Sequence, residues 1–330
     1  MSQAGWNGKR VLVSGAGGFI GSHLVETLLG AGARVRALVR YNSRDDAGYL
    51  KEIKNREGLE IIAGDLRNFR TVDQAVNGMQ VVFHLGAVIS IPYSYLYPVE
   101  VVETNIQGTL NMLLACTKYE VEKVVHTSSS EVYGTAQQVP IGEAHPLQGQ
   151  SPYSASKIGA DKLAESFYRA YSLPVMTLRP FNTYGPRQSG RAVIPTIIAQ
   201  ALSREVVHLG NLETRRDFTY VDDSVGGFIK AAEAEGVNGE VINLGTGVDI
   251  SIGEVANLII AMIGRPVRIE CEEQRMRPEK SEVMRLISDN RLAGEKLDWH
   301  PRVSLEEGLR RTITWIEGHM ELFDPDRYVF

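Results

Sequence analysis

Short apolar runs alternate with longer amphipathic segments through the first 180 residues of this chain. The runs are RVLVSG, RVRALV, LEIIAG, QVVFHLG, KVVHTSS and PVMTLRP, and a segment with helical periodicity separates each from the next. This alternation predicts a parallel, doubly wound α/β sheet whose strands are joined by right-handed helical crossovers. Ligands bind at the carboxyl ends of the strands in such sheets, so functional residues are expected there.

Beyond Pro180 the pattern loosens into a turn-rich stretch, FNTYGPRQSG, followed by a helix. The segment RRDFTYVDDSVGGFIKAAEA predicts a return to the sheet and a helix, and EVINLG predicts a further strand. After these come a helix, a short strand, an arginine-rich loop and two final helices. We therefore predict two intergrown parts, a Rossmann domain and a smaller C-terminal region: residues 1–180 with 214–250, and residues 181–213 with 251–330.

The composition excludes several classes of protein but does not indicate a reaction. Apolar residues make up 43% and charged residues 23% of the 330 residues, and the net charge of −5 gives no bias toward nucleic acid or an anionic membrane. The two cysteines, Cys116 and Cys271, lie in a predicted helix and a predicted strand, so neither a disulfide framework nor a metal site is expected. No apolar run approaches the roughly 18 residues of a membrane span. We expect a cytoplasmic protein without a metal.

A glycine-rich turn, GAGGFIG, directly follows the first predicted strand. It places Gly15, Gly18 and Gly21 three residues apart ahead of a helix. A tight turn there lets backbone N–H groups and the helix N-terminus meet a pyrophosphate. The alternative is a strand-to-helix turn with no ligand, but the βαβ context favours a dinucleotide site.

The end of the second strand leaves the identity of the dinucleotide open. An NAD site usually has Asp or Glu there, which accepts a hydrogen bond from the ribose 2′-OH. This chain reads ALVRYNSR instead, so Arg40 and Arg44 suit a 2′-phosphate, whereas Asn42 or Ser43 can bond an NAD ribose. The arginines are equally explained as solvated surface charges, so both NAD and NADP remain open.

Two further strand ends carry residues that suit a cofactor. After the third strand, Asp65 in GDLRN can accept from the adenine amino group, although a lone Asp there is also typical of a helix cap. After the fourth strand, Gly86 and Ala87 in HLGA are small enough for the backbone to lie against a cofactor. The value of these residues lies in their order and spacing.

The most specific signal is YSASK, which places Tyr153 and Lys157 four residues apart on one face of a predicted helix. A nearby ammonium favours the phenolate, so we expect Lys157 to lower the pKa of Tyr153 from its usual value near 10. Such a base can take a proton from an alcohol while a nicotinamide takes the hydride. The pattern alone is common by chance, but its place after the fifth strand makes it specific.

At this point the chain resembles the extended short-chain dehydrogenase/reductase family over essentially its whole length. The motifs GAGGFIG, HLGA, ETNIQGT, TSSSEVYG, YSASK, RPFNTYGP and RRDFTYVDD occur in the family's order and spacing. The resemblance implies a Rossmann enzyme that uses NAD, with NADP still open, and acts on nucleotide-linked sugars. Tyr153 and Lys157 match the catalytic pair, and Ser129 matches the hydroxyl that steadies the oxygen on sugar carbon 4.

The resemblance also implies which residues contact the cofactor. They lie on the glycine turn, on the ends of the second to fifth strands, and on the helices that follow the fourth and fifth strands. The expected cofactor-binding residues are Gly15, Gly18, Phe19, Ile20, Gly21, Arg40, Asp65, Leu66, Leu85, Gly86, Ala87, Asn105, Thr127, Tyr153 and Lys157.

Glu131 separates the reactions known in this family. Sugar 4-epimerases generally carry a small or hydroxyl residue at its position, because they only rotate the oxidised sugar and return the hydride. Hexose 4,6-dehydratases carry glutamate there. Once carbon 4 is a ketone the hydrogen on carbon 5 is acidic, so a carboxylate can remove it and water leaves from carbon 6. The resemblance therefore favours a 4,6-dehydratase that forms a 4-keto-6-deoxy sugar nucleotide.

The residue before Glu131 specifies this further. Glucose-type dehydratases have Asp directly before the Glu, where this chain has Ser130. Mannose-type dehydratases have Ser-Glu, which implies that Glu131 serves first as base and then as acid. The alternative role for Glu131 is to cap the local turn.

Three other functions remain as alternatives. Ser-Glu also occurs in nucleotide-glucuronate decarboxylases, but VISIPYSYLYP, the segment expected to face the sugar, contains no cation for a uronate and suits an N-acetyl hexose better. A 4-epimerase is the second alternative, and a non-catalytic nicotinamide-sensing protein is the third. Over the whole chain the motifs look most like the 4,6-dehydratases of legionaminic-acid-type pathways, which act on UDP- or GDP-linked N-acetylglucosamine.

The C-terminal half supplies candidates for holding the substrate diphosphate. The planar fork of arginine suits phosphate oxygens, and by resemblance several positions match the nucleotide-binding residues of the family. The expected substrate-binding residues are Ser90, Ser94, Ser130, Asn182, Arg187, Arg216 and Arg277. The apolar faces of the helices near 99–118 and 153–171 serve as core or, as the resemblance implies, pair across a homodimer.

Overall fold

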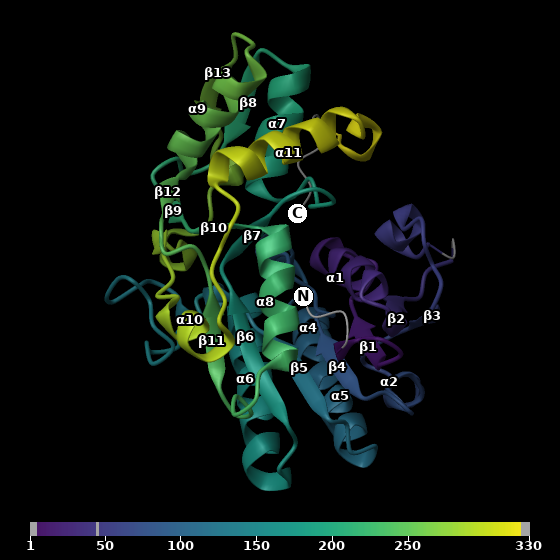
Figure 1. The fold of residues 1–330 in the computed structure, drawn as a ribbon. Helices are drawn as coiled ribbons and strands as arrows, with labels where there is room; N and C mark the ends of the chain where they lie inside the picture. Colours follow the sequence, from purple (N-terminus) through teal and green to yellow (C-terminus); the bar gives the residue numbers. More distant parts are fainter. Residues whose placement is uncertain (1–4, 44–45, 325–330) are drawn as a thin grey trace.

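The computed structural model describes residues 5–43 and 46–324. Within these ranges the main sheet has seven strands, all parallel, in the order β11-β6-β5-β4-β1-β2-β3 (Figure 1). The strands are β1 (Arg10–Ser14), β2 (Arg34–Arg40), β3 (Leu59–Gly64), β4 (Val81–His84), β5 (Lys123–Thr127), β6 (Val175–Pro180) and β11 (Val241–Leu244). The six apolar runs expected to be strands, and the later EVINLG, all lie in this sheet, so the predicted fold class is confirmed.

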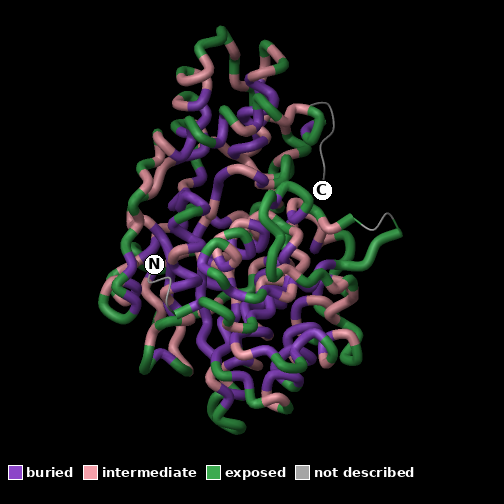
Figure 2. Tube along the Cα trace, turned by 45° about the vertical axis from the view of Figure 1, so that its right-hand side comes forward, coloured by how far each residue is buried: buried purple, intermediate pink, exposed green. Residues whose placement is uncertain are grey.

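Helices cover both faces of the sheet, because alternate residues of the central strands are apolar on opposite faces. Leu12, Val82 and Val124 pack in one core with α2, α5 and α6, whereas Val13, Phe83 and Val125 pack in another with α1 and α8. These helices are α1 (Phe19–Gly30), α2 (Phe69–Val76), α5 (Gly108–Lys118), α6 (Pro152–Tyr171) and α8 (Val221–Glu233). Figure 2 shows the buried chain concentrated along the middle of the molecule.

Shorter helical segments carry the chain from the fourth strand to α5 and from the fifth strand to α6. Between β4 and α5 these are α3 (Ile91–Leu96), α4 (Pro98–Val102) and the π-helical turn η3 (Glu103–Gln107), and between β5 and α6 there is η4 (Ser130–Tyr133). One more short segment, η2 (Gly48–Glu52), lies between β2 and β3. Helix α3 begins at Ile91 behind a Ser90 cap, with Pro92 in its first turn, and α4 begins at Pro98, so proline and capping residues fix both starts. Helices α3 and α4 both pack on α6, which places them beside the catalytic motif.

The C-terminal part builds a smaller lobe beyond the carboxyl ends of the strands, at the top of Figure 1. Its strand groups are β7 (Asn182–Tyr184) with β10 (Phe218–Tyr220); β12 (Ile250–Ser251), β9 (Arg215–Arg216) and β14 (Arg285–Leu286); and β8 (Val206–Leu209) with β13 (Arg268–Cys271). Its helical segments are α7 (Val193–Ser203), α9 (Ile252–Ile263), η5 (Glu273–Arg275), η6 (Glu279–Ser281), α11 (Leu305–Glu317) and η7 (Met320–Leu322). Helix α10 (Arg291–Leu297) instead packs against β11 and α8 beside the main sheet. Cys116 lies in α5 and Cys271 in β13, as predicted. The exact domain boundaries stay a prediction.

Over the described ranges, no helix combines the length and the apolar character needed to cross a bilayer.

Candidate active site

The glycine turn after β1 leaves no room for side chains. Gly15 has a φ of +69°, and a Cβ on it would lie 2.9 Å from the Cα of Gly86 in the loop after β4. A Cβ on Gly21 would lie 2.2 Å from the carbonyl oxygen of Gly15. Gly18 is the N-cap of α1, so the first N–H groups of that helix, at Phe19 and Ile20, face outward without a side-chain cap. This cradle fits a dinucleotide pyrophosphate.

The loop after β4 is braced from two sides. The backbone N–H of Gly86 donates to Ser14 Oγ at 3.0 Å, and Leu66 packs so closely that a Cβ on Gly86 would lie 2.7 Å from its Cδ1. Asn105 is buried in η3; its amide accepts from Val88 N at 2.8 Å and donates to Ser156 Oγ at 2.9 Å. Asn105 therefore ties the loop that contains Leu85 to Val88 to helix α6.

The structure gives Arg40 and Asp65 partners within the protein. Arg40, at the end of β2, lies with its Nη2 3.1 Å from Glu100 Oε1 on α4. Asp65 accepts from Arg67 at 2.6 Å, and this bond is the main reason that the pKa of Asp65 lies below its usual value. Asn42 closes its own loop by donating to the carbonyl oxygen of Asp46. Arg44 lies outside the described residues.

The catalytic motif is assembled where α6 begins beside the end of β5. A capping box of Ser151 and Ser154 fixes the first turn of α6 and so the position of Tyr153, whose side chain is almost fully buried. Lys157 Nζ donates to the carbonyl oxygen of Thr127 at 2.5 Å. This bond fastens the helix to the last residue of β5, directly before the segment that carries Ser129 and Glu131.

The pKa values of Tyr153 and Lys157 differ from those expected from the sequence. Burial raises the pKa of Tyr153 to about 12, and a hydrogen bond with Ser129 only partly offsets the effect of burial. Burial also lowers the pKa of Lys157 to about 8, although Asp161 acts in the opposite direction. The expected lowering of the Tyr153 pKa is therefore wrong, because desolvation of the phenol dominates and the nearby charges of Glu131 and Asp161 raise the pKa further.

Lys157→Met is expected to raise the free energy of unfolding by about 2 kcal/mol at pH 7. A pKa that falls from 10.5 to about 8 on folding means that the buried charge costs roughly 3 kcal/mol below pH 8, and the lost hydrogen bond offsets about 1 kcal/mol of that gain. Between pH 8 and 10.5 the Lys157 amine is protonated only in the unfolded chain, so the wild type becomes more stable as the pH rises. The stability difference between Lys157→Met and the wild type should therefore shrink. Urea unfolding at pH 7 and at pH 10 measures both effects.

Lys162→Met is the control for this prediction, because Lys162 is an exposed lysine of the same helix. It should change stability by less than about 1 kcal/mol at either pH. A Lys157→Met variant that is no more stable than the wild type at pH 7, or whose gain is the same at both pH values, would contradict the assignment.

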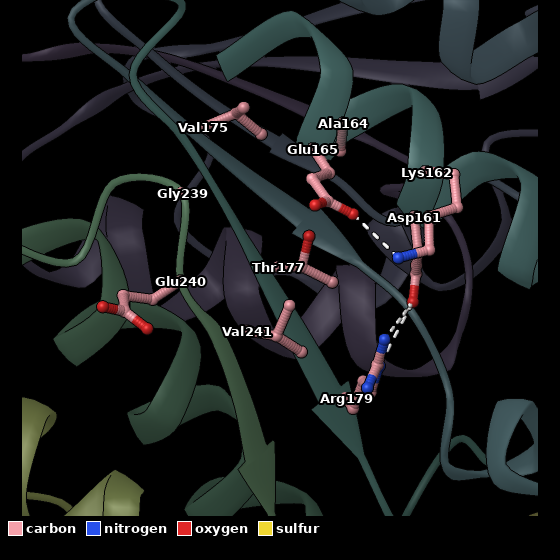
Figure 3. A pocket seen from close by; sticks show the side chains of 10 residues that line it. All are labelled: Asp161, Lys162, Ala164, Glu165, Val175, Thr177, Arg179, Gly239, Glu240 and Val241. Atoms are coloured by element: carbon pink, nitrogen blue, oxygen red, sulfur yellow. Dashed lines mark hydrogen bonds and ion pairs between the residues drawn. The ribbon is translucent and has the colours of Figure 1, made fainter. Parts of the chain in front are cut away.

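Asp161 continues the face of α6 that carries Tyr153 and Lys157, and it is a functional-site neighbour that sequence reasoning missed. Its carboxylate accepts from Ser128 Oγ at 2.8 Å, from Arg179 Nη2 at 3.0 Å and from His126 Nε2 at 3.2 Å. Burial alone would raise the pKa of Asp161, but the hydrogen bond with His126 and the Arg179 charge together hold it below its usual value. Figure 3 shows the Asp161–Arg179 pair beside a cavity of about 40 Å³ between α6, β6 and β11. Position i+4 from Lys157 was the available signal.

A second cluster joins Glu131 to the predicted diphosphate residues. Arg277 Nη1 lies 3.7 Å from Glu131 Oε1 and 3.9 Å from Glu282 Oε1. Arg216 is buried on β9, with its Nη2 3.8 Å from the same oxygen of Glu282. The structure therefore brings Glu131, Arg216 and Arg277 together. It adds Glu282, which only its place in the arginine-rich loop could have indicated.

Two buried oxygens at this edge have no hydrogen-bond partner among the described residues. They are Oδ1 of Asn182, on β7, and Oγ1 of Thr127, at the end of β5. Buried polar atoms are normally paired, so an orphaned one at the end of a strand is typical of a site that awaits a ligand. Asn182 and Thr127 were both predicted to bind ligands.

Three predicted substrate residues have other roles in the described chain. Arg187 has a φ of +67° and pairs with Glu26 at 2.9 Å and Glu52 at 3.3 Å, so it connects α1 with η2 and not with the cluster around Glu131. The fully buried hydroxyl of Ser94 donates to the carbonyl oxygen of Ile91, and Ser90 Oγ caps α3. Ser130 is buried in η4 beside Glu131. Arg187 is the clear departure from the prediction, because two nearby carboxylates hold its charge.

Three features define the class of protein as a nicotinamide-dependent enzyme of the extended short-chain dehydrogenase/reductase type. They are a glycine turn after β1, a Tyr–Lys pair at the start of α6 and a serine after β5. The family profile described as GDP-mannose 4,6 dehydratase matches residues 12–312. The chain belongs to this family of nucleotide-sugar dehydratases and epimerases.

Relatives of both reaction types align over nearly the whole chain. A UDP-glucose 4-epimerase of Mycolicibacterium smegmatis is 35% identical over 94% of this chain and 99% of its own. The structure of DesIV, a dTDP-glucose 4,6-dehydratase from Streptomyces venezuelae with NAD and TYD bound, superposes with a TM-score of 0.87 at 28% identity, over 96% of this chain and 99% of that one. A UDP-N-acetylglucosamine 4-epimerase from Methanobrevibacter ruminantium M1, in complex with UDP-N-acetylmuramic acid, gives 0.86 at 30% identity, over 95% and 99%.

Proposed function

We propose that the protein is an NAD-dependent nucleotide-sugar 4,6-dehydratase. The observation that carries this proposal is Glu131, a largely buried carboxylate in the first turn of η4 whose charge acts on the phenol of Tyr153. Elimination of water needs a second acid–base group beside the site of oxidation, whereas epimerisation does not. The turn after β5 supplies that group two residues beyond Ser129.

We assign residues of this chain to the oxidation at carbon 4 and to the elimination of water. Tyr153 takes the proton of the carbon-4 hydroxyl, and Ser129 holds that oxygen through the hydroxyl that also bonds the phenol. NAD supplies the hydride acceptor when it is bound. Glu131 removes the proton from carbon 5 of the ketone and donates a proton to the hydroxyl that leaves carbon 6. Return of the hydride to carbon 6 and of a proton to carbon 5 gives a 4-keto-6-deoxy sugar, with the net loss of one water.

The cofactor assignment is supported by the cradle around Gly15, Gly21 and Gly86, where any Cβ would collide with backbone or with Leu66. The structural neighbour DesIV was determined with NAD bound. We assign the first turn of α1 to the pyrophosphate, and we assign the end of β5 and the start of α6 to the nicotinamide end. Thr127 Oγ1, buried and unpartnered in the described chain, is free to bond there.

The substrate is proposed to be a UDP- or GDP-linked N-acetylglucosamine. Arg216 and Arg277 supply two guanidiniums for the diphosphate, and Asn182 adds a buried, unpartnered amide oxygen on β7. The segment from Val88 to Tyr97 carries no charged side chain, which favours a neutral sugar. A structural neighbour that acts on UDP-N-acetylglucosamine is consistent with this choice.

Incubation with sugar nucleotides tests the proposal directly. We expect the mass of UDP- or GDP-linked N-acetylglucosamine to fall by one water, since the elimination is the net reaction. Mass spectra after incubation with UDP- and GDP-linked hexoses, N-acetylhexosamines and glucuronate make the measurement. An isomer of unchanged mass would establish the 4-epimerase that the mycobacterial relative suggests, loss of carbon dioxide would establish a decarboxylase, and cofactor binding without turnover would establish a sensor.

A homodimer and a cytoplasmic location complete the proposal. Helices α5 and α6 pack side by side, and apolar side chains along α4, α5 and α6 are exposed: Val99, Val102, Leu114, Tyr168 and Tyr171. Exposed apolar side chains on neighbouring helices suit contact with a second copy of the same helices. The two cysteines are both free thiols, which suits a reducing compartment.

A further inference from the structure

We propose that Glu100, on helix α4, makes this site prefer NAD over NADP by holding a fixed carboxylate against Arg40 at the end of β2. The inference rests on the proposed function only in its assignment of a nicotinamide dinucleotide to the glycine cradle. It names a residue that discriminates between the two cofactors, and it can be tested without any sugar substrate.

The end of β2 is the position from which Rossmann proteins usually distinguish the two dinucleotides. A carboxylate there accepts from the 2′-OH of NAD, whereas an arginine accommodates the 2′-phosphate of NADP. Arg40 alone would therefore favour NADP. In the structure its Nη2 lies 3.1 Å from Glu100 Oε1, so a carboxylate reaches this position from α4, 60 residues further along the chain.

Glu100 is held more firmly than Arg40. The arginine side chain is 72% exposed but the glutamate only 24%, and Tyr93 donates to the other carboxylate oxygen of Glu100 at 2.5 Å. The bond from Tyr93 lowers the pKa of Glu100, and the charges of Arg40 and Arg67 lower it further. The carboxylate is therefore ionised at neutral pH and stays in place if Arg40 swings away, which an exposed ion pair alone would not ensure.

The charged residues around Arg40 and Glu100 strengthen the preference for NAD over NADP. Arg67 pairs with Asp65 at 2.6 Å and lies 3.5 Å from Glu103, so it is already engaged on two sides. Among the described residues of this group, two guanidiniums face three carboxylates, those of Asp65, Glu100 and Glu103. A 2′-phosphate, which carries a charge of about −1.5 to −2, would meet more carboxylates than guanidiniums among these described residues. A ribose hydroxyl can instead donate to a carboxylate.

Glu100→Gln is the test. We expect the dissociation constant for NADP to fall about tenfold, because the substitution removes a charge close to the phosphate and releases Arg40 to bind it. The dissociation constant for NAD should change by less than about threefold, since an amide oxygen still accepts a hydrogen bond. Calorimetric titration of the full-length protein with NAD and with NADP, at low and at high salt, gives both constants. The preference of the wild type for NAD should weaken at high salt.

Two further variants show whether the position of the carboxylate matters. Glu103→Gln removes a charge three residues away that faces Arg67 and not Arg40, so it should shift the ratio of the two constants by less than about threefold. Tyr93→Phe removes the bond that fixes Glu100 and should shift the ratio in the same direction as Glu100→Gln, but less. Urea unfolding of each variant checks that the fold is retained.

The inference is overturned if the wild type binds NADP as tightly as NAD, if Glu100→Gln leaves the ratio within about twofold of the wild type, or if Glu103→Gln shifts it equally. A protein that binds neither dinucleotide would overturn the cofactor assignment as well. A protein that shows the expected binding shift but no loss of water from any sugar nucleotide would leave Glu100 as the discriminator and reject the dehydratase.

Discussion

Tyr153→Phe is expected to stop the reaction at its first step. The variant keeps the ring that fills the buried site but loses the oxygen that takes the proton from the carbon-4 hydroxyl, and a positioned general base contributes about a hundredfold to ten-thousandfold to a rate. No reduced nicotinamide should then accumulate on mixing with substrate. Stopped-flow absorbance at the band of the reduced cofactor measures this step directly.

Tyr171→Phe is the matched control, since Tyr171 ends the same helix with 60% of its surface exposed. It should behave as the wild type in both binding and oxidation. Reduced cofactor that forms in Tyr153→Phe at a rate within about tenfold of the wild type would assign the base to another group. The burial of Tyr153 makes this a demanding test, because it raises the pKa of the phenol to about 12.

Glu131→Gln is expected to pass the first step and fail at the second. Oxidation at carbon 4 uses Tyr153 and Ser129, so reduced cofactor and the 4-keto sugar should accumulate, in contrast to Tyr153→Phe. Elimination should slow about a hundredfold to ten-thousandfold, because the amide cannot take the carbon-5 proton. The measurement is the rate at which solvent deuterium enters carbon 5, followed by mass spectrometry together with the absorbance of the reduced cofactor.

Glu282→Gln separates loss of the base from loss of local charge. Both glutamates lie within 4 Å of Arg277 Nη1, but only Glu131 follows Ser129 in the turn after β5. The Glu282 variant should therefore change the KM for the sugar nucleotide and retain elimination. Deuterium exchange at carbon 5 at the wild-type rate in Glu131→Gln would remove Glu131 from the mechanism and favour its alternative role as a turn residue.

Tyr153 and Glu131 belong to two separate groups of side chains, which is why their variants should separate oxidation from elimination. The Tyr153–Lys157–Asp161 face of α6 is tied to the end of β5 through Thr127 and Ser128. Glu131 instead points to the arginines of the C-terminal lobe. In the proposed mechanism, oxidation therefore depends on the sheet and α6, whereas elimination depends on Glu131, whose carboxylate also faces Arg277 of the C-terminal part.

Several features of the site followed from the sequence because they are local. The glycine turn, the Tyr–Lys spacing and the Ser129–Glu131 segment each lie within seven residues, and a strand end or helix start fixes their direction. Strand ends of a parallel sheet meet at one edge, so order along the chain was enough to predict that these motifs converge. The arginines of the C-terminal half were harder, because loops without periodicity do not fix which side chains meet.

Arg187 shows why such loops defeat sequence reasoning. It lies in FNTYGPRQSG, next to predicted ligand residues, yet its charge is held by Glu26 and Glu52, which come from the first 52 residues of the chain. Glu282 is the converse case: nothing in its local sequence marks it, but it shares Arg277 with Glu131. Ion pairs between residues far apart in the sequence depend on which surfaces pack together in the fold, and residue spacing does not predict this.

By itself the sequence determined the parallel sheet, the dinucleotide turn and the identity of the central catalytic candidates, because each depends on periodicity or on spacing within one element. Only the tertiary structure decided how those groups are charged and paired. Burial, which depends on the whole packed interior, reversed the expected pKa shift of Tyr153. At the end of β2, where the sequence leaves NAD and NADP both open, Arg40 meets the carboxylate of Glu100 from a helix 60 residues away, since a folded chain brings charges together in space that its sequence keeps apart.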